Sequence, residues 1–340
     1  MVTTTARRSN GRAYPDGHKQ VAELQRARML TAMVQEVSER GAANVSVGHV
    51  VGRSGVSRRT FYEIFHDREE CFLAAFDEAL RDATELVVPA YESEGSWLAR
   101  VRAGLTALLE FLDSDRAAAR LLIVESLAAG PSALERRRQV IAQLVSVLEL
   151  GRAEGSAKLD PPALTAEAIV GGLLSVLHSR LAGSPDSETR TTDGRRETVE
   201  RSLLDLAGPS MGTIVLPYMG PVAARKEIER PAPKPTGTSP IRRSDPLQDL
   251  PMRLTYRTMR VLTAVAELGA DGGCPSNRAV GEHAGIGDQG QASKLLARLH
   301  KLDLIENQGG DPARGEPNAW RLTATGRQVY ESIAGLEKQS

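Results

Sequence analysis

Two adjacent arginines precede aromatic residues in the stretch GVSRRTFYEIF, residues 55–65. The guanidinium groups of Arg58 and Arg59 can bind phosphate, and they can donate two parallel hydrogen bonds to the edge of a guanine. The side chains of Phe61 and Tyr62 instead favour a packed, apolar environment. We therefore expect a helix that presents a basic face to an anion and an apolar face to its own domain.

The residues around the arginines predict a helix, a glycine-containing turn and a second helix. The first helix is expected at Ser46–Arg53, Gly55 lies in the turn, and the Ser57 hydroxyl can cap the second helix. This order is typical of a DNA-binding helix-turn-helix, in which the start of the second helix meets base edges in the major groove. Arg58 or Arg59 is thus predicted to bind a guanine, which discriminates by about 1–3 kcal/mol per pair.

A longer helix is predicted on each side of this motif. Apolar residues recur at helical spacing over His18–Arg40, and Gly41 follows as a helix-ending residue. After the motif, Asp67 can cap a helix that begins at Arg68. The Tyr62 ring is expected to stay packed while its hydroxyl reaches a phosphate oxygen. The residues expected to face the core are Val56, Phe61 and Phe65.

The segment from Leu30 to Phe76 resembles the DNA-binding domain of the TetR-type transcriptional regulators. The resemblance rests on Gly55-Val56-Ser57 at the turn, Thr60-Phe61-Tyr62 in the second helix, and Phe65 followed by the basic Arg68. It implies an N-terminal three-helix DNA-binding domain, an all-helical dimerising ligand domain, and release of DNA when the ligand binds. It also implies that Ser46, Tyr62 and Arg68 contact phosphates.

The DNA contacts predicted for this first domain, residues 18–66, extend into the start of the following helix. They are Ser46, Ser57, Arg58, Arg59, Thr60, Tyr62, His66 and Arg68. The alternative for Ser46 and Arg68 is helix capping or a local ion pair, and the alternative for the arginine pair is a solvated surface helix. Residues 1–17 are predicted to be a flexible arm. Its arginines, which would enter a minor groove or belong to a disordered tail, are Arg7, Arg8 and Arg12.

Composition limits the remaining function classes. The 340 residues suit two or three domains, and 4% aromatic content implies cores of Leu, Val, Ile and Ala, which favours helices. The formal net charge is zero, so any basic surface for DNA must be local. Two distant cysteines, a polar N-terminus without a signal-peptide pattern and no long apolar run indicate a cytoplasmic protein without a membrane span. No cofactor is implied.

Residues 67–220 are predicted to form an all-helical ligand-binding and dimerisation domain. The candidate helices, separated by turn signals, are Trp97–Leu112, Ala117–Ala128, Ala133–Arg152, Pro162–Leu181 and Arg195–Met219. This region contains no Gly-rich phosphate loop, nucleophile elbow or metal-spaced histidine pair. An enzyme is therefore the third-ranked function, after a DNA-binding regulator and an interaction module.

The TetR resemblance implies that the last two of these helices form a homodimer's four-helix bundle, which would set two DNA-binding motifs about one DNA turn apart. The predicted interface residues are Ile169, Leu173, Val176, Leu177, Leu203 and Ile214. An unidentified small-molecule effector would lie among the preceding helices. Its predicted lining, for which plain core is the alternative, is Leu105, Leu108, Phe111, Leu122 and Val124. His178 is open to pocket, interface or core.

The composition changes at residues 221–250, which are rich in proline and predicted to be a semi-rigid linker. Residues 251–340 are predicted to form an α+β winged helix-turn-helix, so the whole chain would be all-α up to this domain. Helices are expected at Pro251–Leu268, Asn277–Ala284 and Gln289–Leu302, then a hairpin and a last helix near Thr325. The hairpin resembles the wing of such domains, and RLTATGRQV is similar to the exit of MarR-type regulators.

A second basic helix face is expected in this domain. Ser276 and Asp288 can cap two helices, and Gln291 would complete a capping box with Asp288. Lys294, Arg298 and Lys301 recur at i, i+4 and i+7 and so share one face. The predicted DNA contacts are Lys294, Arg298, Lys301 and Arg314, the last at the wing tip. The alternatives are a solvated helix face or a protein-binding domain.

Dimerisation helices of free-standing MarR-type proteins are missing, so the middle domain would supply dimerisation. A zinc site formed by Cys274, His283 and His300 matches no common ligand spacing. We therefore predict no metal.

Overall fold

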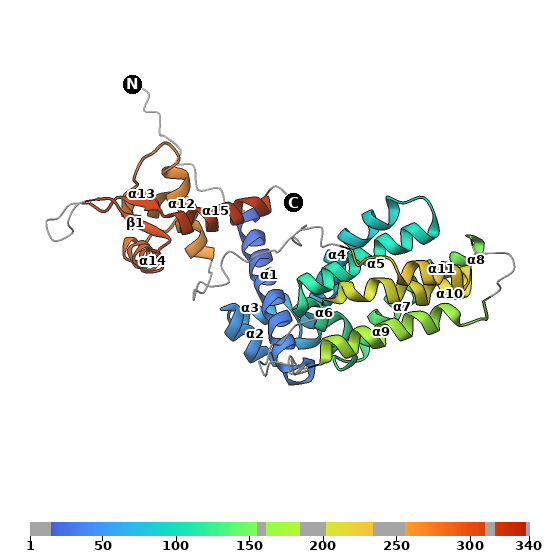
Figure 1. The fold of residues 1–340 in the computed structure, drawn as a ribbon. Helices are drawn as coiled ribbons and strands as arrows, with labels where there is room; N and C mark the ends of the chain where they lie inside the picture. Colours follow the sequence, from blue (N-terminus) through green and yellow to red (C-terminus); the bar gives the residue numbers. More distant parts are fainter. Residues whose placement is uncertain (1–14, 155–160, 184–201, 234–255, 310–316, 338–340) are drawn as a thin grey trace, which may run out of the picture. The chain divides into compact units, whose positions relative to one another are not determined.

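Helices dominate the fold of the computed structural model, which describes residues 15–154, 161–183, 202–233, 256–309 and 317–337 (Figure 1). The described residues divide into two compact units. One contains residues 30–50 and 65–233, and the other contains residues 15–29, 51–64 and 256–337. Each unit is described by itself.

The N-terminal elements follow the predicted order. Helix α1 (Pro15–Arg40) ends at Gly41, whose φ of +79° favours glycine. A 3-10 turn, η1 (Ala42–Asn44), leads to α2 (Val47–Ser54) and α3 (Arg58–Ile64). Helix α4 (Arg68–Glu92) begins after Asp67, whose carboxylate accepts a hydrogen bond from the Glu70 amide at 2.8 Å. The predicted helix end at Gly41 and the predicted cap at Asp67 are confirmed.

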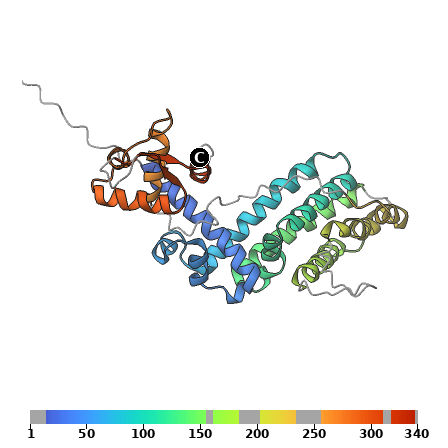
Figure 2. The same cartoon turned by 60° about the vertical axis from the view of Figure 1, so that its left-hand side comes forward.

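The helical body continues from α4. Its further helices are α5 (Trp97–Ser114), α6 (Arg116–Ile123), η2 (Glu125–Leu127), α7 (Pro131–Glu149), α8 (Gly151–Glu154) and α9 (Thr165–Ala182). Helices α4 and α5 lie side by side, joined by a short turn (Figure 2). An apolar cluster around Trp97, Ile169 and Tyr218 forms much of the core, and the Trp97 indole donates to the Val147 carbonyl at 3.0 Å. The helices predicted between Trp97 and Leu181 are confirmed, except that two of them are divided: α6 is followed by the separate 3-10 turn η2, and α7 by the separate short helix α8.

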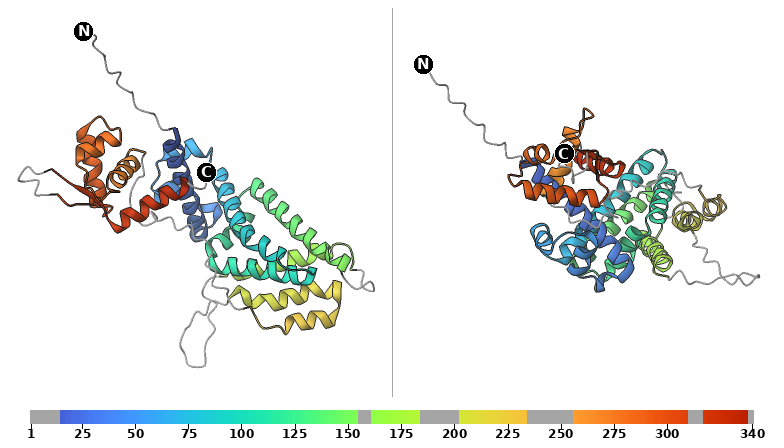
Figure 3. Two further views of the ribbon diagram at one scale, coloured as in Figure 1. Left: turned by 90° about the horizontal axis from the view of Figure 1, so that it is seen from above. Right: turned by 90° about the vertical axis from the view of Figure 1, so that its left-hand side faces the viewer.

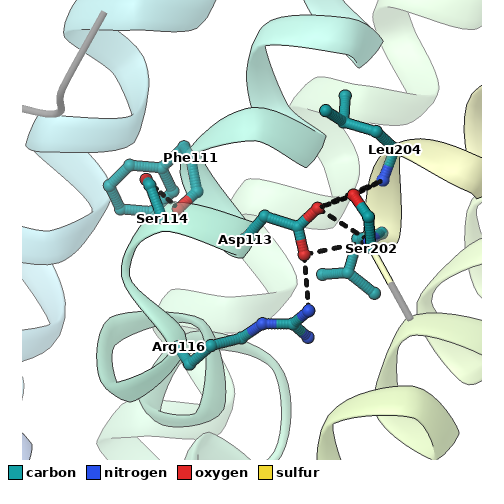
Figure 4. A network of polar contacts seen from close by, with 7 residues as sticks. Phe111, Asp113, Ser114, Arg116, Ser202 and Leu204 are labelled. Atoms are coloured by element: carbon teal, nitrogen blue, oxygen red, sulfur yellow. Dashed lines mark hydrogen bonds and ion pairs between the residues drawn. The ribbon is translucent and has the colours of Figure 1, made fainter. Parts of the chain in front are cut away.

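The predicted helix Arg195–Met219 is confirmed from Ala207 onward but is wrong over residues 202–206. The backbone at Ser202 is extended, a 3-10 turn follows at η3 (Leu203–Leu206), and α10 (Ala207–Met219) begins only then. The cause is Asp113 at the end of α5, which accepts hydrogen bonds from the Leu203 amide at 2.7 and 2.9 Å and from the Ser202 hydroxyl (Figure 4). These bonds satisfy the free amides of a new helical start at this position. Residues 195–201 lie outside the described residues.

The predicted linker is wrong over its first residues, because Pro221–Ile228 forms a helix, α11, packed on α10. Gly220, with φ +85°, reverses the chain between the two helices. On α11 the buried Glu227 accepts two hydrogen bonds from the Arg102 guanidinium, at 2.7 and 2.8 Å. This ion pair to α5 ties α11 to the helical body. Residues 234–250 of the predicted linker lie outside the described residues.

The C-terminal elements contribute most of a second apolar core, which also contains Leu24 of α1. They are α12 (Tyr256–Leu268), α13 (Asn277–His283), α14 (Gln289–Lys301), β1 (Ile305–Asn307), β2 (Trp320–Leu322) and α15 (Ala324–Glu337) (Figure 3). The strands pair antiparallel with Ile305 opposite Leu322. Gly326 permits the close approach of α15, since a Cβ there would overlap the Leu304 carbonyl oxygen. The predicted helices, hairpin strands and last helix are confirmed where the structure describes them. Residues 251–255, at the start of the first of these predicted helices, lie outside the described residues.

Candidate nucleic-acid interface

The start of α3 is built by its turn and its cap. Gly55 has φ +66°, a conformation that suits glycine, and Ser57 follows two residues later. The Ser57 hydroxyl oxygen accepts from the Thr60 amide at 3.1 Å, and the two hydroxyl groups lie 2.9 Å apart. The predicted cap is confirmed. Ser57 and Thr60, two of the predicted DNA contacts, therefore help to order the first turn of α3.

The side chains of α3 separate into a buried and an exposed set. Val56, Phe61 and Phe65 are buried, as predicted, while Arg58 and Arg59 are exposed. Tyr62 differs from the prediction, because its side chain is 57% exposed and its ring makes an edge contact with Phe61, centroids 5.4 Å apart. The ring lies at the helix surface because position 62 follows the buried position 61 by one residue, about 100° around the helix.

The two arginines of α3 differ in their partners. Arg59 Nε donates to Glu63 Oε1 at 2.9 Å, in an exposed i, i+4 ion pair. Within the described part of the chain, the Arg58 guanidinium makes no ion pair or hydrogen bond. Sequence reasoning missed Glu63, although its spacing from Arg59 is a recognisable signal. An exposed pair of this kind is worth about 0.2–1 kcal/mol, so Arg59 can exchange Glu63 for another anion.

Ser46 makes the helix-capping contact that was its alternative to phosphate binding, whereas Arg68 binds a distant backbone carbonyl, which neither alternative predicted. Ser46 caps α2, with its hydroxyl accepting from the His49 amide at 3.3 Å while its own amide donates to His49 Nδ1 at 3.2 Å. Arg68 is half-buried and donates to the Ala42 carbonyl at 2.5 Å. His66, the remaining predicted contact, is exposed. The partnership of Ser46 with His49 was missed, although the spacing of a capping box was visible.

The second predicted basic face lies on α14. Asp288 caps this helix by accepting from the Gly290 amide at 2.8 Å. Lys294, Arg298 and Lys301 are exposed on it, and their side chains make no ion pair within the described ranges. The opposite face is buried through Leu296 and Leu299, with Leu295 half-buried. This division of the helix follows the predicted pattern.

Of the other predictions for this region, one is wrong, one is confirmed, and one concerns a residue that the structure does not describe. Gln291 does not complete the capping box as predicted, because its side-chain oxygen Oε1 accepts a hydrogen bond from the Arg257 guanidinium at 3.2 Å. Arg314 lies outside the described residues, as do Arg7, Arg8 and Arg12. Ser276 caps α13 as predicted, accepting from the Ala279 amide at 3.3 Å.

A network of amide side chains joins the hairpin to α13 and α14, and sequence reasoning missed it. Asn277 Oδ1 accepts from the Trp320 indole at 2.6 Å, and Asn277 Nδ2 donates to the Ser293 hydroxyl at 3.0 Å. Asn307 accepts from the Ala319 amide at 2.9 Å across the hairpin. These bonds connect β2 to the beginning of α13 and to the middle of α14. No short-range sequence signal links residues so far apart.

Most of the predicted dimer residues lie inside the chain's own core. Ile169, Leu177, Leu203 and Ile214 are buried and Leu173 is half-buried, while Val176 is 43% exposed. Between the exposed Glu167 and Arg180, the other outward positions of α9 carry small residues instead. They are Ala168, Gly171, Gly172, Ser175, Val176 and Ser179. The large apolar residues predicted for the interface on α9 thus pack mainly against the chain's own core.

The predicted pocket residues are also part of the body's packing. Phe111 and Leu122 are buried, and Leu105, Leu108 and Val124 are half-buried. His178 is half-buried on α9. Cys71 is buried and Cys274 half-buried, and neither forms a disulfide.

The described residues provide neither a metal site nor a single membrane-spanning helix. They contain no group of three or more His, Cys, Asp and Glu side chains placed to hold a metal ion. No single helix among them is long and apolar enough to cross a bilayer, although the pair Arg116–Leu127 and Pro131–Ala153, bent by 111°, meets the length and composition criteria together.

Comparison with protein families bears on the α2–α3 region. Residues 30–75 match the model of the bacterial regulatory proteins of the tetR family. The match runs from the second half of α1 through α2 and α3 into α4. TetR-family regulators are DNA-binding transcription factors without enzymatic activity. A comparison with curated proteins returned no match.

Several solved structures are similar to part of the chain. The fatty acid degradation regulator FadR from Bacillus halodurans is 17% identical with a TM-score of 0.45, over 56% of this chain and 94% of that one. FadR from Bacillus subtilis, solved in complex with stearoyl-CoA, is 14% identical with a TM-score of 0.44, over 56% and 97%. The ketosteroid transcriptional regulator KstR2 of Mycobacterium tuberculosis is 18% identical with a TM-score of 0.41, over 55% and 93%.

Proposed function

We propose that this protein is a cytoplasmic, DNA-binding transcriptional repressor that contacts base edges with the first turn of α3. The observation that carries the proposal is the exposure of Arg58 and Arg59 on a helix whose other face is buried, inside a segment that matches the tetR family model. Arginine is the side chain best suited to a guanine edge. The Ser57 cap orders the helix end that carries both arginines.

Base contacts and phosphate contacts can be separated by comparing two duplexes. Footprinting of the full chain across a genome would supply a cognate duplex, and a scrambled duplex would serve as its control. Arg58→Ala and Arg59→Ala are expected to lose about 1–3 kcal/mol on the cognate duplex and less on the scrambled one. Tyr62→Phe is expected to weaken both equally, as a lost phosphate contact would. Arg138→Ala, an exposed arginine on α7, is the matched control. Equal losses on both duplexes for the arginine variants would contradict base contact.

We also propose that residues 251–340 form a winged helix-turn-helix that contacts DNA through α14. The support is the run of exposed cations at Lys294, Arg298 and Lys301, which have no ion-pair partner in the described part of the chain and lie in the same domain as an antiparallel hairpin. In this proposal Arg314 follows the DNA backbone from the hairpin tip. The alternative is a module that binds a partner protein through the same exposed face.

The salt dependence of DNA binding distinguishes these two roles of α14. If its cations contact phosphates, the slope of log K against log salt should fall by roughly 0.9 for each contact removed. The test compares the full chain with Lys294→Ala/Arg298→Ala and with a chain that ends after residue 233. That end point keeps α11 and its ion pair to Arg102. An unchanged slope and footprint in both variants would favour the partner protein.

We further propose that the protein is a homodimer, held by the outward face of α9. Its small residues would let two copies of this helix approach closely, as in a four-helix bundle. Val176→Glu is expected to give monomers in sedimentation, whereas Val88→Glu, at a similarly exposed position on α4, should not. A folded dimer in the Val176 variant would place the interface elsewhere.

The proposed effector is a small molecule held among α5, α6 and α7. The half-buried Leu105, Leu108 and Val124 are the predicted lining that retains exposed surface. Native mass spectrometry of the purified protein would detect a retained ligand. Loss of the added mass in Leu108→Trp, with the fold kept, would support this location.

A further inference from the structure

Both backbone polar groups of one buried residue, Ala42, are bound by charged side chains distant in sequence. The Ala42 amide donates to Glu125 Oε2 at 2.8 Å, and its carbonyl accepts from Arg68 at 2.5 Å. Ala42 is buried and Glu125 is only 8% exposed. Removing one partner of a buried hydrogen bond leaves the other unsatisfied, so the arrangement is costly to break.

Glu125 is in turn bound to a second charged residue. Arg120 donates to Glu125 Oε1 at 3.2 Å and to the Leu181 carbonyl, in the last turn of α9, at 2.5 Å. A continuous series of hydrogen bonds therefore runs from the end of α9 to the residue that follows Gly41. All of these residues belong to the same compact unit.

The backbone that carries Glu125 is itself anchored. Glu125 begins η2, directly after α6, and the final carbonyls of α6 at Leu122 and Ile123 accept from Arg137 at 3.5 and 3.3 Å. Burial lowers the pKa of the Arg137 guanidinium from its ordinary value, but this group stays charged in proteins. The cation at this helix end thus fixes the turn from which Glu125 extends.

Ala42, whose backbone is bound in this way, lies immediately before the predicted DNA-contacting helices. Ala42 starts η1, Val45 is buried, and Ser46 caps α2. Only the turn around Gly55 separates α2 from α3. Because so few residues intervene, the position of Ala42 constrains where α2 begins.

We infer that Glu125 is a positioning residue for DNA binding, which holds the junction between α1 and α2 and couples it, through Arg120, to the end of α9. This inference rests on the proposed function of α3. A rearrangement of η2 or of the end of α9, whether from an effector or from dimer formation, would then release the Ala42 amide. Coupling of this kind needs a measured energetic link, since a spatial path alone does not establish it.

The first measurement follows the Ala42 amide directly, in the full chain and without DNA. Hydrogen exchange of a peptide containing residues 41–46 should speed up by about tenfold in Glu125→Ala, because this amide loses its acceptor. Glu125→Gln, which keeps an acceptor oxygen but loses the charge, should have a smaller effect. Glu135→Gln, an exposed glutamate on α7 paired with Arg138, is the control and should leave exchange unchanged. Unchanged exchange in Glu125→Ala overturns the inference.

The second measurement is binding to a mixed-sequence duplex at low salt. Glu125→Ala is expected to lose about tenfold in affinity, a typical size for coupling between sites, and Glu125→Gln less. Faster exchange with unchanged affinity would make the contact merely structural and would also overturn the positioning role. Failure of the wild-type chain to bind any duplex would refute the proposed function instead, while the exchange result would still report on the contact itself.

A third variant tests the link to α9. Arg120→Gln should speed exchange at residues 41–46 by about threefold, and the double variant with Glu125→Ala should add little to the single change. Additive effects of the two substitutions would show that Arg120 does not act through Glu125. If Glu125→Ala fails to fold, Glu125→Gln and Arg120→Gln provide the same comparison.

Discussion

The helix pair α2–α3 and the helix pair α13–α14 present charge in different ways. On α3 the exposed Arg59 is paired with Glu63, whereas Arg58 makes no ion pair with any residue that the structure describes. On α14 three exposed cations recur along one face without an ion pair in the described residues. A mixed face suits contacts that depend on the position of individual groups, whereas a purely cationic stripe suits the uniform charge of a phosphate backbone.

The two pairs also differ in what holds them. The segment before α2 is bound through its backbone by Glu125 and Arg68. The pair α13–α14 is instead joined to its hairpin by neutral amide groups around Asn277. Charged side chains thus bind the backbone that precedes the first pair, while neutral amide groups bind the second pair to its hairpin. We therefore expect the two regions to respond differently to the following changes.

The largest effect is expected from Gly326→Ala. A Cβ at this position would meet the Leu304 carbonyl, so backbone must move, and the C-terminal core should lose about 3 kcal/mol or more. The chain has two tryptophans, Trp97 in the helical body and Trp320 in the hairpin. Urea unfolding followed by Trp320 fluorescence in a Trp97→Phe background would measure the loss. The Trp97 transition in a Trp320→Phe background should not move; an equal shift of both would show that the regions unfold together.

A smaller loss is expected from Asn277→Ala. This change leaves the Trp320 indole and the Ser293 hydroxyl without their partner, at a cost of about 1–3 kcal/mol. Asn44→Ala is the counterpart in the first region, since Asn44 makes one exposed bond to the Arg40 carbonyl, and its effect should stay within about 0.5 kcal/mol. The same Trp320 transition measures the first change, and circular dichroism the second. A negligible loss in Asn277→Ala would mean that the network does not stabilise the hairpin.

The caps of α3 and α14 form a matched pair of tests. Ser57→Ala and Asp288→Ala each remove the side chain that accepts from amides of the first turn, and each should cost about 1 kcal/mol. Hydrogen exchange of the first turn of each helix would measure this loss locally. Fraying at α3 should also lower cognate DNA affinity, because Arg58 lies in that turn. Unchanged exchange in either variant would show that its helix start is held by packing alone.

The smallest effect is expected from Glu63→Gln. Removing this carboxylate releases Arg59 and removes a negative charge from the face of α3, so affinity for a scrambled duplex should rise a few-fold at low salt. The gain should fade as salt screens the interaction. Glu282→Gln, which breaks the exposed i, i+4 pair with Arg278 on α13, is the control. A loss of cognate affinity in Glu63→Gln would instead indicate that Glu63 itself accepts from a base.

Much of the local structure could be predicted from the sequence. The glycine turn at Gly55, the caps at Ser57, Asp67, Ser276 and Asp288, and the inward positions of Phe61 and Leu296 all follow from interactions between residues a few positions apart. Such interactions depend on backbone periodicity and on short-range hydrogen bonds, which a single segment contains in full.

Other outcomes depended on groups that no local pattern contains. Asp113 starts a helical turn at Leu203 from another part of the chain, and Arg102 holds Glu227 so that a predicted linker begins as a helix. Ile169 and Ile214 are predicted interface residues, yet they are buried, because tertiary packing determines which apolar face of each helix points inward. The sequence by itself determined where helices begin, end and carry charge. Only the tertiary structure decided which of those charges stay exposed and which, like Glu125 and Arg68, bind the protein's own backbone, because that choice depends on which groups are brought together when water is excluded.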